Sequence, residues 1–183
     1  MSASAQSESD LKTLIDALER SRENYLKAVI SVSEKAAGVK LNDSSWSILK
    51  VAEHVAAAEH GMSRSLEMAT VKTTPTDIEM DRQIVAGSTN RENKRQAPER
   101  VHPKGRWKSL AECVEAFKVT RAKTIDTVRN AEGLRSKLVM HPLAGELDGF
   151  QQVLVMAGHC ERHALQIEEI KASAAYKAVA DTN

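Results

Sequence analysis

Aromatic side chains are scarce in this sequence, making up only 3% of its 183 residues. A core with so few rings must be built from Leu, Ile, Val, Ala and Met, and that palette favours helices over a β-sandwich. Hydrophobic residues make up 42% and charged residues 28%, a composition typical of a globular protein and not of a disordered one. The length fits one ordinary domain with its own hydrophobic core.

Three further absences narrow the class of protein. The only two cysteines, Cys113 and Cys160, are far apart in sequence, so we expect two reduced thiols and no disulfide framework. No window approaches the roughly 18 apolar residues of a membrane span, and residues 1–9 carry no apolar signal core. The formal net charge of +1 gives no reason to expect a polyanion-binding protein. We therefore expect a soluble, cytoplasmic protein without a membrane partner.

Apolar residues recur at helical spacing in four long segments. The expected helices run over residues 9–38, 46–69, 109–130 and 148–175, and a short additional helix is expected over residues 76–85. Ser109 and Asp148 each begin a capping box, with Glu112 and Gln151 at the third helical position. No segment reads convincingly as a strand. The predicted organisation is a disordered tail over residues 1–7, a helical domain over 8–175 and a polar tail over 176–183.

The connection between the second and third helices determines the topology of the bundle. Antiparallel neighbours need only a short link, whereas this connection spans about 35–40 residues. Such a segment can return along a helix of about 36 Å, so we expect the second and third helices to run parallel, joined by a long crossover. The predicted fold class is therefore all-α, a four-helix bundle with a crossover between helices 2 and 3.

Three histidines lie on the inward-facing stripes of two of these helices. His159 and His163 are four residues apart, which places both imidazoles on one helix face where they can reach a single ion. His54 faces inward from the second helix. Burying three imidazoles without partners is costly, and a divalent metal would supply the partner. Three protein ligands would leave a coordination position open, as in catalytic sites.

A second interpretation of these histidines stays open. A single histidine on an apolar face is more often a hydrogen-bonded core residue than a ligand, and this applies to His54 above all. Sequence spacing cannot show whether the three side chains converge.

Two parts of the chain resemble the signatures of the DinB-like superfamily. The first is the run WSILKVAEHV over residues 46–55, and the second combines HPLAGELD over 141–148 with HCERH over 159–163 and Gln166-Ile167. The resemblance covers roughly residues 8–172. It implies an up-down-down-up four-helix bundle, which agrees with the crossover argued above. It also implies metal ligands at His54, His159 and His163, with zinc or nickel as the metal.

The resemblance implies a metal-dependent enzyme acting on a small molecule. Relatives include thiol-dependent S-transferases and isomerases that use small thiol cosubstrates, and others are described as metal-dependent hydrolases. The alternative is a non-catalytic bundle that binds a metal or a small molecule, which a fourth protein ligand or a sealed site would favour. We expect a homodimer. Neither the substrate, the native metal nor a general base is predicted, although Glu53 and Glu161 flank the ligands in sequence.

The remaining candidate residues receive structural interpretations. His60 is expected to be exposed, His102 to lie in a loop and His141 to belong to a turn. Cys160 points about 100° around the helix from His159, which disfavours it as a fourth ligand. Trp46 is expected to plug the end of the bundle, and Trp107 to pin the start of the third helix.

The segment from residue 91 to 108 carries seven Lys or Arg against two Glu. It has one aromatic residue and no array for stacking bases, so we interpret it as a solvated loop and expect no nucleic-acid partner. Substrate selection is expected to depend on residues 70–108, which match nothing recognised in the family, and on residues 131–148.

Overall fold

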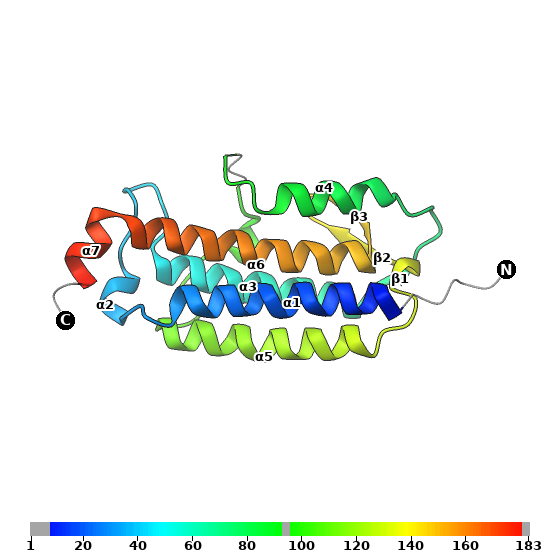
Figure 1. Ribbon diagram of the computed structural model, residues 1–183, viewed down its shortest axis with the longest axis horizontal. Coiled ribbons are helices and arrows are strands. Elements are labelled where there is room, and N and C mark those ends of the chain that lie inside the picture. Colours follow the sequence, from blue (N-terminus) through cyan, green and yellow to red (C-terminus); the bar gives the residue numbers. More distant parts are fainter. Residues whose placement is uncertain (1–7, 93–95, 181–183) are drawn as a thin grey trace.

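The computed structural model describes residues 8–92 and 96–180, and four long helices form its body (Figure 1). These helices are α1 (Glu8–Val29), α3 (Ile48–Glu67), α5 (Leu110–Arg129) and α6 (Gly149–Ala172). Helices α1 and α6 run in one direction and α3 and α5 in the other, so the order is up-down-down-up. Both the all-α bundle and the parallel pair α3–α5 were predicted, and both are confirmed. None of the described helices is long and apolar enough to cross a membrane.

Helix starts follow the capping residues that the sequence indicated. The Asp148 carboxylate accepts the backbone N–H of Gln151 at 2.8 Å, and the Gln151 side chain accepts the backbone N–H of Asp148 at 3.1 Å. This is the predicted capping box of α6. Ser109 caps α5 through the N–H of Glu112, but the Glu112 carboxylate accepts the N–H of Lys108 instead of completing the box.

The crossover between α3 and α5 packs along the bundle as an additional layer. It contains α4 (Ile78–Ser88), which lies along α6, and the 3-10 helix η1 (Glu99–Val101) (Figure 1). The short helix expected in this region is therefore present. Gly158 of α6 allows the close approach, because a Cβ atom there would lie only 2.2 Å from the Cβ of Ser88. The crossover is thus held against α6 at the residue before His159.

The structure differs from the prediction in its small elements. Three short antiparallel strands occur where no strand was expected: β1 (Thr70–Val71), β2 (Lys137–His141) and β3 (Gly145–Asp148), in the order β1-β2-β3. They are too short for alternation to stand out in the sequence, and Gly145, at φ +73°, permits the tight turn between β2 and β3.

Both ends of the helical domain also differ in detail. The first helix was expected to reach Gly38, but α1 ends at Val29 and Ser33 caps a separate α2 (Glu34–Ala37). At the other end, where a polar tail was expected, Ala174–Ala180 form α7 and bury Tyr176. The tail predicted for residues 1–7 lies outside the described residues, as do residues 181–183.

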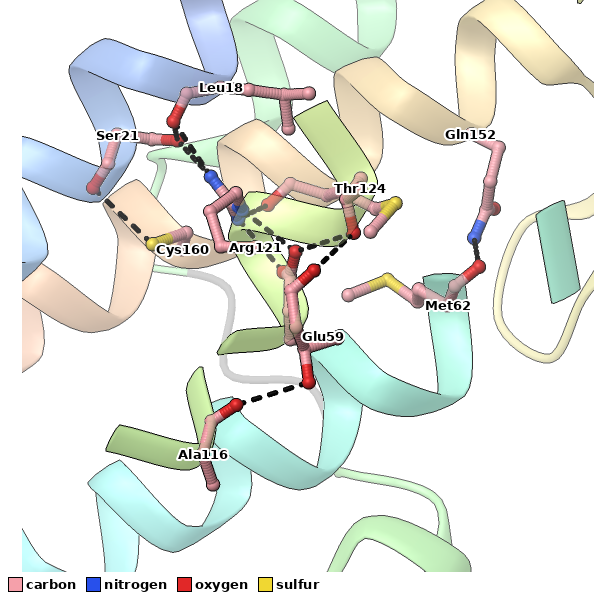
Figure 2. A network of polar contacts seen from close by, with 11 residues as sticks. Leu18, Ser21, Glu59, Met62, Ala116, Arg121, Thr124, Gln152 and Cys160 are labelled. Carbon is pink, nitrogen blue, oxygen red and sulfur yellow. Dashed lines mark hydrogen bonds and ion pairs between the residues drawn. The ribbon is translucent and has the colours of Figure 1, made fainter. Parts of the chain in front are cut away.

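One buried guanidinium connects all four long helices (Figure 2). Arg121 of α5 donates Nε–H and Nη2–H to the two carboxylate oxygens of Glu59 on α3, at 2.7 and 2.8 Å. It donates Nη1–H to the carbonyl of Leu18 and the hydroxyl of Ser21 on α1, and Nη2–H to the carbonyl of Met156 on α6. The arginine side chain is 0% exposed and the glutamate side chain 2% exposed. All five N–H groups of the guanidinium therefore have acceptors.

Removing one partner of this ion pair should destabilise the fold strongly. Arg121→Met leaves the Glu59 carboxylate buried without its counter-charge, and we expect the free energy of unfolding in urea to fall by about 3–5 kcal/mol. The double variant Arg121→Met/Glu59→Leu should recover most of this loss, because it removes both buried charges. Circular dichroism during urea unfolding measures both values.

A matched control lies two residues further along the same helix. Lys123 pairs with Glu67 at 2.7 Å but is 66% exposed, so Lys123→Met should cost less than about 1 kcal/mol. If Arg121→Met lowers the free energy of unfolding as little as the control does, the ion pair of Arg121 and Glu59 is not the clamp that holds the four helices together.

Candidate metal centre

The structure brings the three predicted histidines together between α3 and α6. One ring nitrogen from each of His54, His159 and His163 lies within 4.8 Å of the other two, and the Nε2 atoms of His54 and His159 are 3.0 Å apart. The ring centroids are 4.5 to 5.0 Å from one another. Helix α6 contributes two rings because its residues 159 and 163 are one turn apart, and α3 contributes the third from across the bundle.

Hydrogen bonds set which nitrogen of two of these rings is free. His54 donates Nδ1–H to the carbonyl of Val101 at 2.9 Å, and His163 donates Nδ1–H to Oε1 of Gln166 at 2.8 Å. Because both acceptors are oxygens without a proton, each Nδ1 carries the hydrogen and each Nε2 keeps its lone pair. In metal sites, a hydrogen bond of this kind from the ring nitrogen that does not bind the metal orients the histidine.

Burial favours the neutral form of all three imidazoles. Desolvation lowers the pKa of His54, against the opposite effect of its bond to Val101, and lowers the pKa values of His159 and His163 well below the ordinary value. The neighbouring rings lower the latter two pKa values further. The site therefore presents neutral nitrogen donors at pH 7, the protonation state that metal binding requires.

No fourth protein ligand joins the histidines in the part of the chain that the structure describes. Cys160 turns to α1, where its thiol donates to the carbonyl of Ser21 at 3.3 Å, and burial raises the pKa of this thiol to about 12. His54 and His163 are buried, whereas His159 is half-buried. The cluster is a three-nitrogen set with one partly accessible member, and it fits a single divalent transition metal.

The carboxylates next to the three histidines in sequence face other groups. Glu161 accepts a hydrogen bond from the side chain of Asn24 at 2.8 Å. Glu53 is buried and accepts backbone N–H groups of the loop that follows η1, starting with Lys104 at 2.8 Å. With these partners, neither carboxylate is identified as a proton-transfer group at the histidines.

Trp46 lies against the site. Its ring centroid is 5.0 Å from that of His54 and 5.9 Å from that of His102, so the indole packs on both rings, and it is partly buried against the hydrophobic core. His102 donates Nε2–H to the carbonyl of Ala97, as a loop residue should. Trp107 is partly buried and packs against the hydrophobic core before α5 begins.

Two further histidines behave as predicted. His60 is exposed on α3. His141 lies at the end of β2, where its Nδ1 accepts the backbone N–H groups of Leu143 and Ala144 at 3.3 and 3.1 Å. It is a turn residue, and neither histidine belongs to the cluster.

The sequence interpretation missed the groups that support the site. Val101 acts through its backbone carbonyl, which no side-chain pattern reveals. Arg121 did leave a signal, since it occupies the inward stripe with Cys113, Phe117, Thr124 and Val128, and a charge on such a stripe indicates a buried partner.

Fold and site together define a helical bundle with three imidazoles gathered between its second and fourth long helices. The family model of the DinB superfamily matches residues 17–167, and the chain belongs to that superfamily. Among solved structures, YfiT from Bacillus subtilis, described as a probable metal-dependent hydrolase with an unusual four-helix bundle topology, is similar with a TM-score of 0.64. The match covers 92% of this chain and 89% of YfiT at 13% identity, so it shows the shared fold. No curated protein matches the chain.

The neutral histidines predict that the metal-free protein loses stability on acidification. Their folded-state pKa values lie below the unfolded value of 6.5, so below that pH the unfolded chain binds more protons. The full stability is present above pH 6.5, and each buried histidine should cost up to about 1.4 kcal/mol per pH unit below it. Urea unfolding at pH 7.5 and 5.5 measures the loss.

Variants identify which histidines cause this loss. His54→Gln/His163→Gln removes two of the titrating groups and should reduce the difference between the two pH values, whereas His60→Gln, at an exposed position, should leave it unchanged. An equal loss in the double variant and the wild type would assign the pH dependence to other groups.

Proposed function

We propose that this chain is a divalent-metal-dependent enzyme that acts on a small molecule. His54, His159 and His163 would hold one ion, and the observation that carries the proposal is the convergence of their ring nitrogens within 4.8 Å. Neutral imidazoles suit zinc or nickel. Three protein donors leave room for a further ligand at the metal, as expected of a catalytic site.

Two reactions fit this donor set, hydrolysis and thiol S-transfer. A divalent metal bound there would act as a Lewis acid and lower the pKa of a coordinated water or small thiol cosubstrate. The chain's own contribution is to fix the imidazoles, through Val101 and Gln166, and to keep them neutral by burial. The likeness to YfiT supports the hydrolase, and the family implies both reactions.

The alternative is a non-catalytic metal-binding bundle. The structure has a hollow of about 480 Å³ between α3 and α5 and another of about 390 Å³ beside the end of α1, and the three histidines line neither. In the alternative, the ion would join α3 to α6 and no substrate would reach it.

The homodimer and the cytoplasmic location remain predictions. So does the absence of a nucleic-acid partner.

Metal content tests the proposal directly. Protein purified without a histidine tag should carry close to one equivalent of zinc or nickel by elemental analysis, and His159→Ala/His163→Ala should carry none. His60→Ala, which removes an exposed histidine of α3, should keep the full content. If wild type and double variant are equally empty after incubation with metal, the histidines are core residues and the enzyme proposal falls.

Loaded protein then separates the two reactions from the alternative. Ester and amide hydrolysis in the absence of thiol would identify a hydrolase. Consumption of an electrophile only when a small thiol is added would identify an S-transferase. Full metal content without turnover in either assay would support the non-catalytic bundle.

A further inference from the structure

A buried carboxylate next to the His54 ligand anchors a loop of the crossover. Glu53 is 3% exposed, and its two oxygens accept the backbone N–H groups of three consecutive residues, Lys104, Gly105 and Arg106, at 2.8, 3.0 and 2.9 Å. Gly105 has φ +76°, a left-handed conformation in which successive N–H groups can point into one anion. The loop is therefore folded around this carboxylate.

The side chain of Arg106 bonds to backbone carbonyls within the same loop. It donates Nη1–H to the carbonyl of His102 at 2.7 Å and Nη2–H to the carbonyl of Arg100 at 2.7 Å, and it also reaches Glu53 at 3.3 Å. Val101 lies between the two tied carbonyls. Its own carbonyl thus has a fixed direction.

That carbonyl is the acceptor for the ligand ring. Val101 accepts Nδ1–H of His54 at 2.9 Å, which leaves Nε2 of this ring directed to the other two histidines. A second contact runs through aromatic rings, because His102 packs on Trp46 and Trp46 packs on His54. Two adjacent residues of α3 therefore contact the same loop: Glu53 binds its backbone N–H groups, and His54, which belongs to the proposed ion site, binds its Val101 carbonyl.

We propose that Glu53 is a positioning residue for the metal centre, acting through residues 101–106 to hold the Val101 carbonyl that orients His54. The proposal rests on the metal site proposed above. It gives the crossover a role that its basic composition does not suggest, since its backbone amides and the Val101 carbonyl serve the site, supported by one cationic side chain, that of Arg106. Loss of an outer partner of this kind commonly weakens metal affinity by about 10–100-fold.

Glu53→Gln tests this role. Glutamine offers one acceptor oxygen in place of two and turns an NH₂ group towards backbone donors, so the loop should loosen while the helices persist. Titration of metal-free protein with Zn²⁺ should show affinity about 10–100-fold lower than in the wild type. In ¹⁵N NMR of the metal-free protein, the Nδ1–H tautomer of His54 should dominate in the wild type and be lost in the variant.

Glu161→Gln is the matched control, because Glu161 also flanks two ligands but bonds to Asn24 on α1. Its Zn²⁺ affinity and His54 tautomer should equal those of the wild type. If Glu53→Gln does not fold, Arg106→Met replaces it, since this variant keeps the three backbone bonds and removes only the side-chain ties. A smaller loss of affinity in the same direction is expected there.

The outcomes separate this inference from the metal site itself. If the wild type binds no Zn²⁺, the metal site fails, and the tautomer of His54 still decides whether Glu53 positions the ring. If Glu53→Gln lowers thermal stability but matches the wild type in affinity and tautomer, Glu53 only anchors the loop and the inference is overturned. If Arg106→Met in its place changes neither affinity nor tautomer, the loop does not orient His54, and the inference is likewise overturned.

Discussion

The arrangement of the four helices depends on the guanidinium of Arg121. From α5 it bonds to α1, α3 and α6 at once, and the carboxylate of Glu59 makes its burial tolerable (Figure 2). Helices that meet only through apolar faces can slide or rotate against one another. The planar guanidinium of Arg121, with five directed N–H donors, permits little sliding or rotation. Because α3 and α6 carry the three histidines, the same clamp sets the distance across which the imidazoles meet. Its positive charge also helps to lower the pKa of His159.

Two helices of the bundle supply the three imidazoles, and the crossover supplies the carbonyl that accepts the hydrogen bond of His54. The parallel pair α3–α5 requires a long return segment, and that segment passes the site twice. At Gly158 it lies against α6, and at Val101 it meets His54. The topology therefore provides one outer hydrogen-bond partner, the Val101 carbonyl, for a site whose three histidines come from two helices. In this way a segment with few regular elements contributes to function through its backbone.

Sequence periodicity was sufficient for much of this structure. Residues 54, 159 and 163 lie on inward stripes that helical spacing reveals, and the length of the crossover set the direction of α5. The short strands escaped prediction because five residues or fewer cannot establish an alternating pattern. The Val101 carbonyl and the role of Glu53 depend on the path of a loop, which tertiary contacts determine. Arg121 and Glu59 were visible as charges on apolar stripes, but their pairing across 62 residues was not.

X-ray absorption spectroscopy of the zinc-loaded protein tests the three-histidine centre most directly. The account predicts three imidazole nitrogens at about 2.0–2.1 Å, with any further ligand a light atom from solvent or substrate. A sulfur neighbour at about 2.3 Å would place Cys160 in the site. Fewer than three imidazoles would show that the rings seen together here do not act together on an ion. Either of these results would contradict the account.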